Sequence, residues 1–363
     1  YPLLARDEEQ LKQYEYHQLI LDEAQNIKNP RAKAAQVVRQ LKARHRLCLT
    51  GTPMENHLGE LWALFYFLMP GFLYSQEIFN KKYRHPIEKR GDQQLRQKLV
   101  NRIKPFILRR LKTDVAKELP EKTTIEVNID MNDQQSKLYE AVRATMQENI
   151  QKIVAEKGFK RSQIQILDAL LKLRQVCCHP SLLKLDSVKT GQAHSAKLEQ
   201  LMDMVVPMVE EGRKILIFSQ FTSMLELIEQ QLHHAEIGYV KLTGKTKKRD
   251  EVITAFQSGQ VPVFLISLKA GGVGLNLTAA DTVIHYDPWW NPAAEDQASD
   301  RAWRIGQDKP VFVYKLITNK SIEEKILALQ QNKAELAHSI LSTDHEGEAK
   351  LTENDVMNLF EKF

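Results

Sequence analysis

Residues 214–267, KILIFSQFTSMLELIEQQLHHAEIGYVKLTGKTKKRDEVITAFQSGQVPVFLIS, contain the pattern that decides the fold. Three short apolar runs have the length of strands, and the two segments between them have the apolar spacing of amphipathic helices. We expect strands at Ile215–Ser219, Tyr239–Leu242 and Val263–Ser267, and helices at Met224–His234 and Lys248–Phe256. Strands that alternate with helices are typical of an α/β fold, so the stretch predicts a doubly wound parallel sheet.

The same alternation continues downstream and also occurs near the start of the chain. Downstream, we expect strands at Thr282–Tyr286 and Val311–Ile317, with a helix at Ala293–Trp303. Upstream, we expect a strand ending in Leu19–Leu21, a helix over residues 31–41 and a second buried strand over residues 46–50. A strand–helix–strand unit normally closes onto a parallel sheet. The sequence therefore predicts two α/β units.

Helical segments separate and follow these two units. We expect an apolar helix at Glu55–Met69, charged helices over 75–101, a basic connector over 103–120 and a half-buried strand at Ile125–Ile129. Two amphipathic helices over 132–173, broken near Gly158, come next, and an amphipathic helix at Ile322–Leu341 ends the pattern. The pattern therefore predicts helical regions outside the two α/β units.

Composition excludes some classes of protein. The 363 residues include three cysteines, too few for a disulfide framework, and this favours a reducing, intracellular location. No run approaches the roughly 18 apolar residues that a membrane span needs, so no membrane partner is expected. The net charge of +5 is a weak signal, but basic residues cluster within 81–90, 102–117 and 245–249. Such clusters are typical of nucleic-acid contacts and also of solvated helix faces.

Asp22 and Glu23 follow the first predicted strand. Ligands of parallel sheets bind at the carboxyl ends of the strands. An aspartate there can hold Mg²⁺, and the adjacent glutamate can orient the water that attacks a γ-phosphate. The alternative is a strand that simply ends in acidic residues.

Thr50, Gly51 and Thr52 follow the second strand. Small hydroxyls and a glycine let the backbone approach a phosphate or the neighbouring carboxylates. Taken alone, the segment is better explained by Thr52 as the N-cap of a helix that Pro53 opens.

The loop Lys269–Asn276 carries three glycines after a buried strand. Main-chain N–H groups in such a loop can approach phosphates of a nucleotide or of DNA. The loop pattern leaves both ligands open, and a surface turn is the alternative.

Gln297, Arg301 and Arg304 stand at i, i+4 and i+7 of the predicted helix Ala293–Trp303. That spacing predicts that all three lie on one face. Guanidinium groups suit phosphate contact and stabilise charge in phosphoryl transfer. The alternative is a solvated face whose arginines pair with acidic residues of the same helix.

Trp289 and Trp290 lie in the loop before that helix, where aromatic rings can stack on nucleic acid. At least one of them is expected to pack beneath the loop instead. Gly244-Lys245-Thr246 resembles the end of a phosphate loop but lacks its first glycine, so we interpret it as a strand-to-helix turn. Cys177-Cys178-His179 lacks the spacing of a zinc site.

Taken in order, the motifs resemble the Swi/Snf-type branch of superfamily-two ATPases over essentially the whole chain. They are DEAQ at 22–25, LTGTPMEN at 49–56, FILRR at 106–110, LRQVCCHP at 173–180, ILIFSQ at 215–220, KAGGVGLN at 269–276, DPWWNP at 287–292 and QASDRAWRIGQ at 297–307. The DPWWNP loop and the closing RIGQ are specific to that branch.

This resemblance implies two RecA-like lobes, with ATP between them and double-stranded DNA across both. Asp22 and Glu23 match the Mg²⁺ and hydrolysis pair, and Thr50–Thr52 match the coupling motif. Arg301 and Arg304 match the arginine fingers, with Gln297 beside them. Gln220, Gly271, Gly272 and Trp290 match positions at or near DNA. With this resemblance we also assign Lys269 to DNA and Gly274 to the nucleotide. ATP and Mg²⁺ are thus the implied cofactors.

The resemblance also implies domain boundaries. We expect part of lobe one at 1–57, a helical protrusion at 58–104, an interlobe linker at 105–130, a second protrusion at 131–194, a complete lobe two at 195–320, and a brace helix with a tail at 321–363.

The implied function is ATP-dependent translocation on double-stranded DNA by a monomer, with remodelling of DNA-bound proteins. The location would be the bacterial cytoplasm or the eukaryotic nucleus. The family's phosphate-binding loop and its lysine belong upstream of Tyr1, so we expect a fragment that does not hydrolyse ATP alone. A strand-separating helicase and a non-catalytic DNA-binding module are the alternatives.

Overall fold

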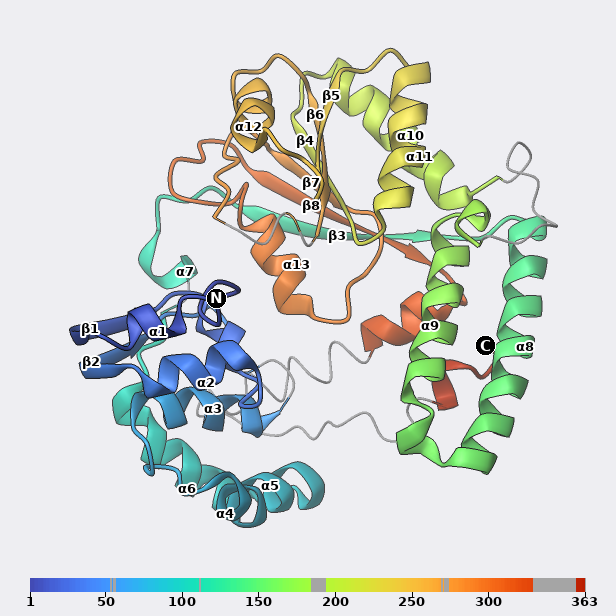
Figure 1. Cartoon of the computed structure of the whole chain (residues 1–363). Coiled ribbons are helices and arrows are strands. Elements are labelled where there is room, and N and C mark those ends of the chain that lie inside the picture. Colours follow the sequence, from blue (N-terminus) through green and yellow to red (C-terminus); the bar gives the residue numbers. More distant parts are fainter. Residues whose placement is uncertain are drawn as a thin grey trace. The chain divides into compact units, whose positions relative to one another are not determined.

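The structure is a computed structural model (Figure 1). It describes residues 1–52, 54, 57–110, 112–183, 194–268, 270, 274–328 and 357–362. Among these residues, Tyr1–Arg109 form one compact unit, the first unit, and the residues from Arg110 onward form another, the second unit. No helix in the described part of the chain is both long enough and apolar enough to cross a membrane.

The second unit is built on a six-stranded sheet in which every neighbouring pair is parallel. The strand order is β3-β8-β7-β4-β6-β5. The strands are β3 (Lys122–Ile129), β4 (Ile215–Ser219), β5 (Tyr239–Leu242), β6 (Val263–Ser267), β7 (Thr282–His285) and β8 (Val311–Thr318). The predicted α/β fold with a parallel sheet is confirmed.

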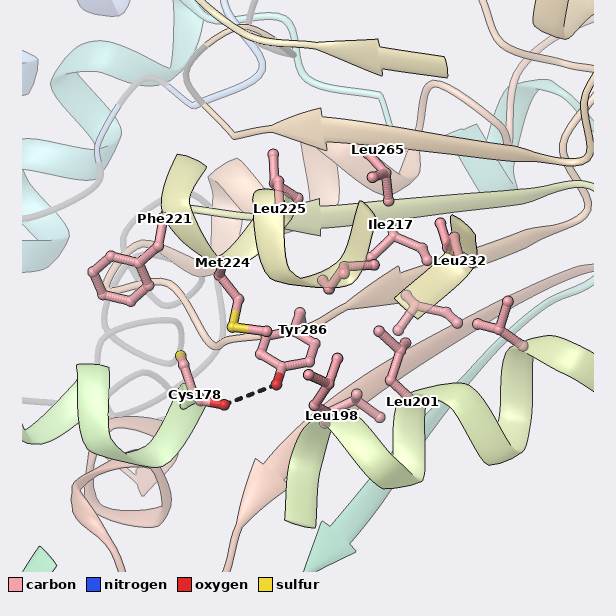
Figure 2. Close-up of a cluster of buried hydrophobic side chains, with 14 of the residues drawn as sticks. Cys178, Leu198, Leu201, Ile217, Phe221, Met224, Leu225, Leu232, Leu265 and Tyr286 are labelled. Atoms are coloured by element: carbon pink, nitrogen blue, oxygen red, sulfur yellow. Dashed lines mark hydrogen bonds between the residues drawn. The ribbon is translucent and has the colours of Figure 1, made fainter. Parts of the chain in front are cut away.

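Helices cover both faces of this sheet, as its apolar strands require. Ile215 and Ile217 of β4 pack with α10 (Ala196–Glu210) and α11 (Thr222–His234), and Figure 2 shows Ile217 and Leu265 beside Leu225 and Leu232 of α11. Leu216 and Phe218 point to the opposite face, which holds α12 (Arg249–Gln257) and α13 (Pro292–Ser299). Alternate residues of each strand therefore build two separate cores.

Strand β3 joins this sheet from a distant part of the sequence. It pairs with β8 over its whole length, from Lys122 opposite Val311 to Ile129 opposite Thr318. Its side chains alternate between half-buried and exposed, as the sequence predicted for this segment. Half burial fits its place at the sheet edge, where β8 is its one neighbouring strand in the described part of the chain.

The first unit contains the predicted strand–helix–strand unit. Its elements are α1 (Glu8–Leu11), β1 (Glu15–Leu21), the 3₁₀ turn η1 (Ala24–Ile27), α2 (Lys33–Gln40) and β2 (Lys42–Cys48), and β1 pairs with β2 in parallel. The expectation of a buried second strand is wrong, because Leu47 of β2 is 40% exposed and Ile20 of β1 is 49% exposed. Side chains of α2 and α3 (Leu58–Leu68) cover one face of this pair, and no described residue covers Ile20 and Leu47.

The charged stretch after α3 is helical, as predicted. It forms α4 (Gln76–Phe79), the π-helix η2 (Asn80–Arg84), α5 (His85–Arg90) and α6 (Gln93–Ile103), followed by the 3₁₀ turn η3 (Lys104–Phe106). Phe79, Tyr83 and Leu99 form one core with Trp62 of α3. This helical region therefore packs on the apolar helix that the sequence placed before it.

A long helical pair precedes α10 in the second unit. It consists of α8 (Asp133–Lys157), the 3₁₀ turn η4 (Phe159–Arg161), α9 (Gln163–Cys178) and the 3₁₀ turn η5 (Pro180–Leu182). Asn132 caps α8 by accepting a 2.8 Å bond from the Gln135 amide, and Gly158 ends it with φ of 75°. The predicted break near Gly158 is confirmed.

The predicted C-terminal helix Ile322–Leu341 lies only partly within the described residues. Residues 322–328 are helical, and residues 329–341 lie outside the described part. The Ile322 amide donates to the Tyr139 hydroxyl of α8 over 2.8 Å, and Glu323 forms a buried ion pair with Lys197 of α10. These contacts fasten the start of the helix to the second unit.

Candidate functional site

The carboxyl ends of β1 and β2 bring two of the predicted loops together in the first unit. The Leu49 amide donates to the Leu21 carbonyl over 2.8 Å, and the Ala24 amide donates to the Leu49 carbonyl over 3.0 Å. Asp22, which follows β1 directly, is exposed. Parallel pairing therefore holds the acidic segment beside the Thr50–Thr52 segment, as the order of motifs predicted.

Gln25 joins these two segments through its side chain. Its Nε2 donates to Glu23 Oε2 over 2.7 Å, and its Oε1 accepts from Thr50 Oγ1 over 2.7 Å. Thr50 Oγ1 in turn accepts a 3.0 Å bond from the Thr52 amide. Sequence reasoning did not assign Gln25 a role. The signal was a carboxamide two residues after Glu23, since the planar amide of Gln can donate through its nitrogen and accept through its oxygen.

The backbone at Glu23 is left-handed. Its φ of 48° is uncommon for a residue with a side chain, and the Asp22 carboxylate supports it by accepting a 2.9 Å bond from the Glu23 amide. Such backbone conformations cluster at functional sites. The Tyr1 hydroxyl donates to the Asp22 carbonyl over 2.6 Å. Burial, together with the nearby Cys48 thiol and the carboxylates of Asp22 and Glu23, raises the pKa of Tyr1 to about 12.

The capping explanation for Thr52 is wrong. The next helix, α3, begins only at Leu58, and its N-cap residue is His57. A Cβ atom added to Gly51 would meet nothing within 4 Å, so its backbone is open to a close approach. The segment thus keeps the open geometry that a phosphate contact needs.

The predicted helix Ala293–Trp303 ends early, at Ser299 of α13. Gln297 is therefore helical, whereas Arg301 and Arg304 lie in the turns that follow, and the three do not share a helix face. Trp303 accounts for the early end because it packs into the core and donates from Nε1 to the Pro120 carbonyl over 2.7 Å. Arg301 is 6% exposed and donates to the Leu275 carbonyl over 3.4 Å, whereas Arg304 is exposed.

The basic connector docks on the turn that carries Arg301. Lys112 of α7 (Lys112–Val115) lies 2.8 Å from the Asp300 carboxylate and donates to the Trp303 carbonyl over 3.1 Å. Lys122 reaches the same carboxylate at 3.3 Å. The connector borders a cavity of about 630 Å³ that Asp296 and Asp300 also line. This volume lies within the range of roughly 300–1,000 Å³ that is common for small-ligand sites. Burial raises the pKa of Asp296 there.

Gln220, one of the predicted DNA contacts, lies at the carboxyl edge of the second sheet. Gln220 follows β4 and lines a pocket of about 510 Å³ together with Ser267 of β6 and the turn at Thr243–Thr246. Gln220 Nε2 is buried and has no hydrogen-bond partner among the described residues. Residues 244–246 form a turn between β5 and α12, as predicted, with the Thr246 amide bonded to the Thr243 carbonyl over 3.1 Å.

Other predicted loop residues are described in part. Lys269, Gly271 and Gly272 lie outside the described residues. Gly274 has φ of 50° and space around its backbone. Trp290 is half-buried and packs against the core of α8 and α9, so the expectation that one tryptophan packs beneath the loop is confirmed.

The Cys177-Cys178-His179 segment is part of the core. Burial raises the pKa of both thiols and lowers the pKa of His179 to about 4. The Cys178 carbonyl accepts bonds from the Tyr286 hydroxyl, at 2.8 Å, and from Ser195 Oγ, at 2.7 Å. Within the described part of the chain, no three His, Cys, Asp or Glu side chains are grouped to hold a metal ion.

Comparison with known proteins gives two family matches. Residues 1–182 match the SNF2-related domain, and residues 196–306 match the helicase conserved C-terminal domain. The Bacillus subtilis protein YwqA is 39% identical over 95% of this chain, and a human SWI/SNF-related regulator of chromatin (subfamily A member 1) is 36% identical over 93%. The chain spans 38% and 33% of the length of these two relatives.

A solved structure, the Sulfolobus solfataricus SWI2/SNF2 ATPase core in complex with double-stranded DNA, is also similar. It is 39% identical and has a TM-score of 0.52, and the match covers 94% of this chain and 72% of that one. The same protein solved as the ATPase core domain gives 38% identity and a TM-score of 0.50.

Proposed function

This chain belongs to the SNF2 family, and from that membership we propose that it forms part of an ATP-dependent translocase on double-stranded DNA. Such a translocase would remodel protein–DNA complexes, which fits the human relative's name as a regulator of chromatin. The observation that carries the proposal is the bridge through Gln25, which holds Glu23 and Thr50 together at the carboxyl edge of parallel strands.

The acidic segment would serve the hydrolysis of ATP. Mg²⁺ in phosphoryl-transfer sites is held by one or two carboxylates, with waters and phosphates as its other ligands. The exposed Asp22 carboxylate at a strand end fits that requirement. Glu23 would orient the attacking water, and Gln25 would hold the Glu23 carboxylate in place from Thr50. Bound ATP with Mg²⁺ would supply the transferable phosphoryl group.

Arginines of the second unit would complete the chemistry. Arg301 and Arg304 would stabilise the charge that develops on the phosphoryl group, a role that guanidinium groups fill in many phosphoryl-transfer enzymes. Thr50, Gly51, Thr52, Gly274 and Gln297 would contact the same nucleotide. Arg304 is exposed and can reach a ligand directly.

DNA would lie against the carboxyl edge of the second sheet, at Gln220, Lys269, Gly271, Gly272 and Trp290. Support comes from the Sulfolobus relative, whose ATPase core was solved with double-stranded DNA. The buried Gln220 Nε2 without a described partner is a further donor available for a contact.

Replacement of Glu23 tests the proposal. In the whole protein, Glu23→Gln should lower DNA-stimulated ATP turnover by about a hundredfold or more, because general-base catalysis commonly contributes that much. DNA affinity should stay unchanged. Glu15→Gln at the other end of β1, which removes only an exposed ion pair with Lys42, is the matched control and should keep normal turnover. Normal turnover in the Glu23→Gln variant would refute the assignment.

A strand-separating helicase is the second candidate, since residues 196–306 match a helicase domain. A strand-displacement assay on a forked duplex distinguishes the two. A translocase should hydrolyse ATP on the fork without releasing the displaced strand.

A further inference from the structure

Arg174 of α9 is a buried arginine that contacts the loop after β7. Its side chain is 3% exposed, and its Nη2 donates to the Pro288 carbonyl over 2.5 Å. The same nitrogen lies 3.9 Å from Asp287 Oδ2. The helical pair α8–α9 is thereby tied to the loop that carries Trp290.

Asp287 extends this link to a second loop. Its Oδ1 accepts from Ser219 Oγ over 2.5 Å, and both of its oxygens lie 3.4 Å from the Gln220 amide. Ser219 Oγ also accepts from the Phe221 amide over 3.1 Å. One buried carboxylate therefore joins the carboxyl ends of β4 and β7, and Arg174 is the cation beside it.

Two aromatic rings flank the guanidinium group. Its Cζ lies 5.6 Å from the centre of the Trp290 ring and 6.0 Å from the centre of the Phe221 ring. Both distances fall within the range of cation–π attraction. A further link from α9 is the bond from the Tyr286 hydroxyl to the Cys178 carbonyl, drawn in Figure 2 near Phe221 and Met224.

We propose that Arg174 is a positioning residue for the binding of duplex DNA. It acts through Asp287, Pro288 and Trp290, and it holds the proposed DNA contacts Gln220 and Trp290 in position relative to each other. The inference rests on the proposed DNA-binding function of these two residues. Stability alone is a poor explanation for the pair, because a buried ion pair is often no more stabilising than apolar residues of the same volume. Burial raises the pKa of Asp287, and the charge of Arg174 opposes that rise.

The test separates positioning from stability. Arg174→Met leaves Asp287 buried without its cation, so it should lower the thermal midpoint and weaken DNA binding about tenfold. Adding Asp287→Asn removes the uncompensated charge. The double variant should recover the thermal midpoint but keep the weak DNA binding, because Pro288 and Trp290 still lack their contacts with the Arg174 guanidinium group. Binding is measured by fluorescence anisotropy of a labelled duplex at fixed salt.

Arg143→Met is the matched control. Arg143 is also buried in the helical pair, where it donates to the Phe360 carbonyl over 2.7 Å, away from the two loops. This variant should lose stability and keep full DNA affinity. If Arg174→Met does not fold, Arg174→Lys decides the same question. It keeps the charge beside Asp287 but loses the planar fork, and it should bind DNA more weakly at a near-normal thermal midpoint.

Three results would overturn the inference: recovery of DNA affinity together with stability in the double variant, full affinity in Arg174→Lys, or an equal loss of affinity in Arg143→Met. Failure of the unaltered chain to bind duplex DNA is a different result, because it refutes the proposed function itself.

Discussion

At the scale of single residues, Gln25 shows how one side chain can organise a site. Its amide donates to Glu23 and its carbonyl accepts from Thr50, so the orientation of each partner depends on the other. A glutamate at this position would present two acceptors and repel Glu23, and a leucine would present neither group. A movement of the Thr50 segment would therefore also move the Glu23 carboxylate, through the side chain of Gln25.

His285 makes the second unit sensitive to acid. Burial, with the charges of Lys315 and Lys122, lowers the pKa of this histidine from 6.5 to about 3, so it is neutral in the folded chain at pH 7. Below pH 6.5, the unfolded chain binds a proton at His285, whereas the folded chain does not bind this proton until the pH approaches 3. The stability that depends on neutral His285 is therefore complete above pH 6.5 and is lost as the pH falls toward 3.

Urea unfolding between pH 6.5 and 4 tests this prediction. His285 should contribute a slope of up to about 1.4 kcal/mol per pH unit. His285→Gln should be less stable at pH 7, where the 2.8 Å bond with Ser299 Oγ is perturbed, and should show a shallower slope. An unchanged slope in the variant would show that other groups cause the acid sensitivity.

The positions of candidate residues were predictable where they follow directly from the order of strands along the chain. Asp22, Glu23 and Thr50 stand at strand ends, and strand ends can be located from apolar runs. Gln25 and Arg174 were not found, because their roles depend on which groups face them after folding. Their partners, Thr50 and Asp287, lie far away in the sequence.

At the scale of elements, α13 shows how distant contacts override a local helical pattern. The sequence from Ala293 to Trp303 has no helix breaker, yet the helix ends at Ser299. Lys112 and Lys122, nearly two hundred residues earlier, bind the Asp300 carboxylate, and Trp303 turns inward to the core. By contrast, β4, β5 and β6 have the predicted bounds, because each is an apolar run enclosed by polar turns.

Charge reversal tests the docking of the connector on this turn. Lys112→Glu should raise hydrogen exchange of the amides at 301–303, because it places two carboxylates together at Asp300. The double variant Lys112→Glu with Asp300→Lys should restore protection in part, because the pair re-forms with reversed charges but Lys122 then faces a lysine. Both groups are about one-third exposed, so the effect should shrink as salt is added. Lys117→Glu, an exposed change in the same connector, is the control and should leave exchange unaltered.

At the scale of the whole molecule, the two units differ in how completely their sheets are covered. The second unit buries both faces of its central strands, whereas β1 and β2 of the first unit leave Ile20 and Leu47 exposed. The sequence predicted two α/β units and their helical additions. It did not predict that β3 pairs with β8, since no local pattern specifies a partner so far away.

The proposed DNA contacts predict how the whole chain binds. Contacts that go mainly to phosphates give sequence-tolerant binding that weakens steeply with salt. Two duplexes of unrelated sequence should therefore bind with similar affinity. Both affinities should fall by about a hundredfold or more between 50 and 200 mM salt if roughly five or six phosphates are contacted. A strong preference for one duplex, or a flat salt response, would argue against backbone recognition.

The pairing of β3 with β8 also has a consequence for biosynthesis. Residues 122–129 leave the ribosome long before residues 311–318, which among the described residues are their only strand partner in the sheet. At typical translation speeds of about 5–20 residues per second, the early strand waits roughly ten to forty seconds. During that interval its backbone N–H and C=O groups lack their native strand partner and can form hydrogen bonds with other extended segments. Strand β3 therefore reaches its place in the sheet only after most of the second unit has been synthesised.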